Sequence, residues 1–123
     1  MGLFDFFKPA WQSEDKDKSL KSIEKITDLR VLGRVAKKAP HQETRLEAVF
    51  KIRKEMVWVD RKKFAEELLV DLAKNAEDSH VRLRAARSLK AYNVLTINVK
   101  KLFADIAENA KDPEVRAAAK EEL

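Results

Sequence analysis

The sequence predicts an all-α fold in which helices are stacked into a solenoid. Residues 68–89 align with residues 102–123 at an offset of 34 positions, and ten of the 22 aligned pairs are identical. An internal repeat of about 30 to 50 residues with helical patterning is typical of stacked-helix solenoids. The chain of 123 residues also contains only two Gly and three Pro, which suits a single, mostly helical domain with few tight turns.

The first twelve residues carry five large apolar side chains, namely Leu3, Phe4, Phe6, Phe7 and Trp11. We expect residues 1–12 to cap the end of the stack, because a solenoid must cover its terminal repeat. A hook for another chain and a membrane-surface anchor are the alternatives, and the anchor is disfavoured because Lys8 is the only base in the segment. Residues 16–26 then match the second helix of a degenerate half repeat.

Three helix pairs are expected after this half repeat, over residues 28–57, 60–92 and 98–123. Each predicted helix shows apolar residues at helical spacing, and several follow an Asp or Asn that can accept a hydrogen bond from an unpaired amide of the first turn. The expected N-capping residues are Asp28, Asp60, Asp78, Asn98 and Asp112. Pro113 takes the first helical position after the last of them, where its missing N–H costs nothing.

The repeated apolar positions are expected to form the core. Almost complete burial is expected for Leu72, Val81, Ala85, Leu89 and Phe103. The helix after Asp60 should turn its apolar face inward, and this face consists of Phe64, Leu68, Leu69, Leu72, Ala73 and Ala76. Gly33 lies inside the helix after Asp28 at a cost of about 1 kcal/mol relative to Ala, so close helix packing is its expected role.

The repeated motif Asp-x-x-Val-Arg-x-x-Ala-x-x-x-Leu, after a helix ending in Ala-x-Asn-Ala, resembles the HEAT repeat. The nearest form is the short HEAT-like repeat also found in bilin-lyase-type proteins. The resemblance covers residues 64–123 and 28–52, and more weakly residues 16–26. It implies a right-handed solenoid of about three and a half repeats, an armadillo-type superhelix of antiparallel helix pairs whose second helices line the inner surface.

The same resemblance implies a ladder of hydrogen bonds between Asp and Arg side chains along the stack. The residues that match this ladder are Asp78, Arg82, Asp112 and Arg116. In the earlier repeats Arg45 is kept, but His41 takes the place of the Asp and Ser19 that of an Arg. The ladder is therefore expected to be incomplete at the N-terminal end.

Catalytic chemistry finds little support in the sequence. Cysteine is absent, which excludes disulfides and thiolate metal sites. The two histidines, His41 and His80, lie at predicted helix starts and share no metal-ligand spacing. Neither a nucleophile elbow nor a phosphate-binding glycine loop is present. We expect no catalytic, cofactor-binding or metal-binding residues, with an accessory or lyase-type role as the minor alternative.

Two groups of residues are candidates for binding a partner. A basic strip on the inner surface would suit carboxylates or phosphates and consists of Lys51, Lys54, Arg84, Arg87 and Lys90. An ordinary solvated face is the alternative, because Glu47 and Glu121 interrupt the strip. The second group lies in residues 53–63, which lack a counterpart in the other repeats. Met56 and Trp58 could anchor an interface there, or Trp58 could fold back over the junction between repeats.

These features favour a non-enzymatic protein-binding module, a scaffold or adaptor, without a cofactor. The net charge of +5 permits an acidic partner. A nucleic-acid-binding module is the alternative, since some HEAT-like proteins are DNA glycosylases that grip DNA with Arg and Trp. We expect a cytoplasmic monomer, because no apolar run approaches the roughly 20 residues of a membrane span and the N-terminus does not fit a signal peptide.

Overall fold

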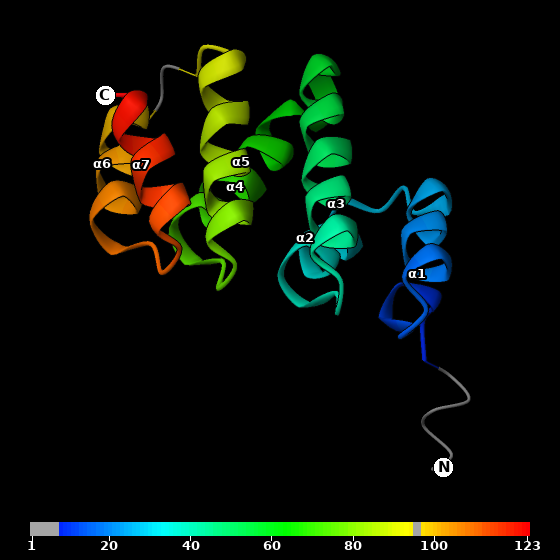
Figure 1. Ribbon diagram of the computed structural model, residues 1–123. Helices are drawn as coiled ribbons and strands as arrows, with labels where there is room; N and C mark the ends of the chain where they lie inside the picture. The colour runs from blue at the N-terminus through cyan, green and yellow to red at the C-terminus, as the bar shows by residue number, and fades with distance from the viewer. Residues whose placement is uncertain (1–7, 95–96) are drawn as a thin grey trace.

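The computed structural model describes residues 8–94 and 97–123. Over these ranges the chain forms seven α-helices and three short 3-10 segments, with no strand (Figure 1). The α-helices are α1 (Lys16–Ser22), α2 (Leu29–Lys38), α3 (Gln42–Lys54), α4 (Val59–Asn75), α5 (Ser79–Ala91), α6 (Val99–Asn109) and α7 (Pro113–Glu121). The 3-10 segments are η2 (Ala10–Gln12), η3 (Ile23–Lys25) and η4 (Glu55–Val57). The expected all-α fold is confirmed.

The helices pack as three successive pairs, α2 with α3, α4 with α5 and α6 with α7. The second helices α3, α5 and α7 stand side by side in one row, and the first helices α2, α4 and α6 form the row behind them (Figure 1). The short helix α1 lies beside α3 and extends the row of second helices at the N-terminal end. This arrangement is a solenoid of helix pairs.

Three of the expected N-caps are formed by side chains. The carboxylates of Asp28 and Asp78 accept hydrogen bonds from amides two residues on, at 2.9 and 2.8 Å, and Asn98 caps α6 through the amide of Lys101 at 3.1 Å. The prediction for Asp60 is wrong, because α4 begins at Val59 and Asp60 falls within its first turn. An acidic side chain in that position still interacts favourably with the helix dipole.

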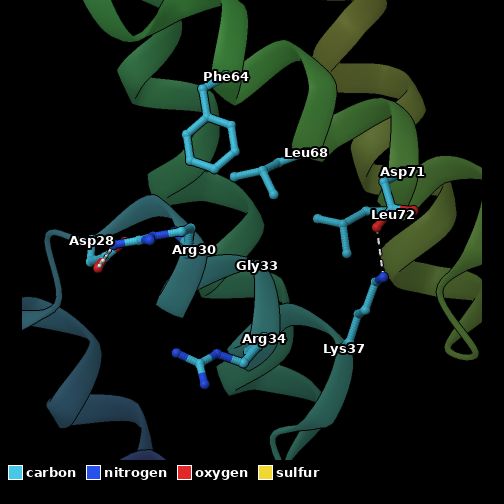
Figure 2. Close-up of a pocket in the computed structure, with 9 residues that line it drawn as sticks. All are labelled: Asp28, Arg30, Gly33, Arg34, Lys37, Phe64, Leu68, Asp71 and Leu72. Carbon is cyan, nitrogen blue, oxygen red and sulfur yellow. Dashed lines mark hydrogen bonds and ion pairs between the residues drawn. The ribbon is translucent and has the colours of Figure 1, made fainter.

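The core runs the length of the stack, and the five side chains expected to be fully buried are all at most 1% exposed. The expectation that Phe64 belongs to the buried face of α4 is wrong, since 39% of this residue is exposed. The buried face of α4 is instead formed by Ala65, Leu69, Leu72 and Ala73, and Leu68 is half-buried. Phe64 lies at the edge of this stripe, where the facing helix α2 does not cover it (Figure 2).

Gly33 in α2 packs directly against α4. A Cβ atom added at Gly33 would lie 3.1 Å from Cδ2 of Leu68, closer than most Cβ contacts in proteins. The missing side chain therefore lets α2 and α4 approach each other. This confirms close helix packing as the role of the glycine.

The N-terminal half repeat is joined to the stack by buried hydroxyl groups. Ser19, which replaces the repeat's arginine, donates a hydrogen bond of 2.7 Å from its Oγ to the carbonyl of Trp11. The same hydroxyl lies 3.0 Å from Oγ1 of Thr44 on α3, and both side chains are fully buried. Trp11 is only 9% exposed. The other members of the expected cap, residues 3–7, lie outside the described residues.

None of the helices that the structure describes is long and apolar enough to cross a membrane.

Candidate interaction surfaces

The first rung of the expected ladder joins α3 to α5. Asp78 accepts hydrogen bonds from Nε of Arg45 at 3.0 Å and from Nε2 of Gln42 at 3.2 Å. Nη1 of Arg45 also donates to the carbonyl of Ala39 at 2.6 Å, which satisfies the C-terminal end of α2. One arginine thus holds together its own helix pair and the next one.

The carboxyl group of Asp78 is subject to opposing effects on its pKa. Burial raises the pKa, whereas the hydrogen bonds from Gln42, Arg45 and the amide of His80 lower it. The lowering effects together are larger, so the pKa lies below its ordinary value. Asp78 is therefore a partly buried carboxylate whose ionised form is stabilised by its neighbours.

The second rung uses an aspartate outside the residues expected to form the ladder. Arg82 pairs with Asp105 of α6 at 2.7 Å, not with Asp112, and donates through Nε to the carbonyl of Ala73 at 3.1 Å. Asp71, the counterpart of Asp105 in the preceding repeat, pairs with Lys37 at 2.6 Å, and this pairing lowers its pKa. Asp71 and Asp105 thus each form an ion pair with a basic side chain of the preceding helix pair.

Asp112 and Arg116 were expected to take part in the ladder, but neither of them forms an Asp–Arg hydrogen bond within the described residues. Asp112 occupies the N-cap position of α7, but its side chain accepts no capping hydrogen bond. Its carboxylate is instead 3.5 Å from Nε2 of His80 on α5, and Glu114 approaches the same nitrogen at 3.5 Å. Arg116 donates to the carbonyl of Ala110 at 2.6 Å, as Arg45 does in its own repeat.

His80, Asp112 and Glu114 are the described residues whose ligand atoms converge enough to contact one metal ion, all within 4.8 Å of one another. One imidazole and two carboxylates form a weak ligand set for zinc, whose sites more often contain several Cys or His ligands. The set is also largely open to solvent, since the exposed fractions of the two acidic side chains are 46% and 68%. Contact between neighbouring repeats accounts for its geometry without a metal.

The basic strip is interrupted in the structure. Lys51 donates hydrogen bonds of 2.8 Å to the carbonyls of Ile23 and Ile26, so its ammonium group holds the end of the half repeat. This corrects its assignment to a free basic surface. Arg87 and Lys90 both approach Glu122, at 3.9 and 3.0 Å. The remaining members are Lys54, whose Nζ lies 4.8 Å from the Phe50 ring centroid, and Arg84, which has no ion-pair partner in the described ranges.

Three consecutive apolar residues are exposed where the connector from α3 leads into α4. Val57, Trp58 and Val59 are 61%, 60% and 95% exposed, and we call these three residues the 57–59 patch. Trp58 therefore does not cover the junction between repeats. Met56 is only 3% exposed and belongs to the core, which corrects its assignment as a partner-binding residue.

The 57–59 patch stands on a fixed frame. The side chain of Arg61 donates to the carbonyl of Thr27 at 2.6 Å and pairs with Glu55 at 3.2 Å, which ties the connector to the start of α2. The carbonyl of Trp58 accepts from the amides of Arg61 and Lys62 at 3.0 and 2.8 Å. Together with the buried Met56, these contacts hold the apolar side chains outward.

A groove of about 770 Å³ lies between α2 and α4 (Figure 2). Its apolar lining comes from Phe64, Leu68 and Leu72 of α4, which point toward α2 where Gly33 leaves room (Figure 2). The ion pairs Asp28–Arg30 and Lys37–Asp71 flank this lining. This groove was not predicted from the sequence, although Gly33 inside an apolar helix was a signal for it.

The family model of HEAT repeats matches residues 29–123. The chain belongs to the HEAT-repeat family. Comparison with curated proteins and with solved structures gave no match. HEAT repeats are in general scaffolds for protein–protein interaction, and the family is typically non-enzymatic.

Among the surfaces of this HEAT-repeat chain, the 57–59 patch is the one whose residues are least occupied by contacts within the protein. Arg45 and Asp78 satisfy one another, and Lys51 is held by backbone carbonyls. The groove between α2 and α4 has its acidic groups already paired. The 57–59 patch alone among them presents consecutive large apolar side chains to solvent.

Proposed function

We propose that the chain is a non-enzymatic protein-binding module, a scaffold or adaptor, that binds its partner through the 57–59 patch. The observation that carries this proposal is the exposure of Val57, Trp58 and Val59 in one short connector. Scattered apolar residues are normal on protein surfaces, but exposed apolar residues that follow one another and include Trp are typical of an interface anchor. Full burial of one such side chain is worth about 1.5–3 kcal/mol.

The frame beneath the patch supports this function. Met56 is buried in the core, and Arg61 joins the connector to Thr27 and Glu55. A surface held in its bound geometry loses less conformational entropy when a partner docks. For the same area buried against a partner, the 57–59 patch should therefore bind more tightly than a mobile loop would.

The charges around the patch favour an acidic partner. Lys54, Lys62 and Lys63 are exposed, and no ion pair is formed by any of them within the described ranges. Of the two nearby acids, Glu55 is already paired with Arg61 and Asp60 is exposed, so bases outnumber the free acid. Cations at the rim of an apolar patch attract carboxylates and raise the association rate. The partner surface that fits is an apolar segment flanked by Asp or Glu.

A photocrosslinking experiment tests the proposal. A photoreactive phenylalanine analogue is placed at position 58 of the full chain, and in the control at position 123, where Leu123 is similarly exposed at 57%. In lysate of the native host, with and without nuclease, we expect one protein to be linked from position 58, independently of nuclease and not from position 123. Equal labelling from both positions contradicts the proposal, and adducts that vanish with nuclease indicate the nucleic-acid alternative.

A further inference from the structure

A second groove lies at the N-terminal end of the stack, where η2 and α1 meet α2. Its volume is about 820 Å³, and its lining includes Trp11 of η2, Ile26 before α2 and Val31 of α2. Pro9 and Ala10, close to the start of the described chain, contribute to the lining of this end groove. A broad apolar hollow at the end of a solenoid exposes surface that the repeats elsewhere bury against a neighbour.

The end groove is strongly basic. Its lining contains Lys18, Lys21, Lys25 and Arg34, against the single acid Glu24. Within the described part of the chain, none of these four bases forms an ion pair. An occupant that combines aromatic side chains with a carboxylate would therefore match the groove in both polarity and charge.

We propose that this end groove binds the chain's own first seven residues. These residues contain Leu3, Phe4, Phe6 and Phe7, and their one charged side chain is the carboxylate of Asp5. The aromatic rings would cover the partly buried Ile26 and Val31 beside the buried Trp11, and the carboxylate would face the lysines. The segment thus matches the end groove in both polarity and charge.

Connectivity favours the chain's own segment over a separate partner. The segment joins the folded part through Lys8 and Pro9, and Pro9 itself lines the end groove. Seven residues can span up to about 23 Å, which allows the segment to reach across the hollow. A ligand on a short tether has an effective concentration of roughly millimolar, so even weak contacts keep it bound.

Paramagnetic labelling of the full chain tests this proposal. Cysteine is absent, so Gly2→Cys accepts a single spin label. We expect the label to remove most of the amide signal intensity of Lys21, Ile26 and Val31. A label at Leu123→Cys is the control and should leave those signals unchanged. Unchanged signals with the label at position 2 overturn the proposal.

Charge exchange tests the recognition chemistry in the same labelled protein. Asp5→Lys should weaken the broadening, and the pair Lys21→Glu with Lys25→Glu should do the same. Combining all three substitutions restores opposite charges and should restore the broadening. Broadening that is the same in all of these variants would overturn the role of Asp5.

A mixed sample distinguishes intramolecular binding from exchange between two copies. Spin-labelled chains without isotope are mixed with isotope-labelled chains that carry no spin label. We expect no broadening at the end groove in this mixture. Broadening there would mean that the segment docks on a second copy, which contradicts intramolecular binding.

Discussion

Replacing Asp78 with alanine is expected to lower the free energy of unfolding by about 2–4 kcal/mol. The substitution removes the cap of α5, which accepts from the amide of His80 at 2.8 Å. It also removes the acceptor for Arg45 and Gln42 of the preceding helix pair. Arg45 is then left partly buried without its anionic partner, which costs more than the loss of an exposed ion pair.

Asp112→Ala is the matched control, because Asp112 occupies the same position one repeat later. Its side chain caps nothing and lies 3.5 Å from His80, so its removal should cost less than about 1 kcal/mol. Urea denaturation measures both variants, with unchanged slopes showing that the unfolding transition is comparable. Equal losses for Asp78→Ala and Asp112→Ala would contradict a structural role of Asp78 that Asp112 lacks.

The lowered pKa of Asp78 predicts a dependence of stability on pH. Because the folded-state pKa lies below the ordinary value of 3.8, the folded protein binds fewer protons at this group than the unfolded chain does. The stabilisation is complete above about pH 5 and is lost as the pH falls through the folded-state pKa. Asp78→Asn should remove this part of the profile, as measured by unfolding at several pH values. A difference between wild type and variant that does not shrink in acid would exclude this mechanism.

Phe103→Ala is expected to lower the free energy of unfolding by about 3–5 kcal/mol. Phe103 is 1% exposed and is the largest of the fully buried side chains that the structure describes. Truncation removes a buried ring from α6, the helix that packs against α5 and α7, and the close-packed surroundings cannot close the cavity completely. Thermal and urea unfolding of the variant measure the loss.

Phe64→Ala provides the control with the same chemical change. Phe64 is 39% exposed at the rim of the groove between α2 and α4, so its truncation should cost only about 1 kcal/mol. The contrast between the two variants measures burial, since both replace a helical Phe by Ala. A comparable loss at both positions would show that Phe64 belongs to the core.

The core and the helix pairs could be predicted because the repeat shows twice which positions are apolar. Val81 and Ala85 recur as Val115 and Ala119, and all four are buried. The partner of Arg82 could not be predicted in this way. Asp105 and Asp112 are both repeated residues, and the repeat does not specify which of them the arginine reaches across the stack.

The binding candidates were harder to predict, because exposure depends on how the connector closes. The sequence places Met56 and Trp58 two residues apart with similar apolar character. In the structure the 3-10 turn η4 directs Met56 into the core, and Trp58 remains outside. Lys51 was misassigned for a related reason, since the carbonyls it binds come from a half repeat 25 to 28 residues earlier.

The most direct test of the 57–59 patch is the affinity of the protein captured from position 58. Titration of that partner compares the wild type with Trp58→Ala and Leu123→Ala, each checked for an unchanged unfolding midpoint. We expect Trp58→Ala to weaken binding by at least about 30-fold, as for an interface anchor worth about 2 kcal/mol, and Leu123→Ala by less than about threefold. A Trp58→Ala variant that binds within about threefold of the wild type would contradict a docking role for this surface.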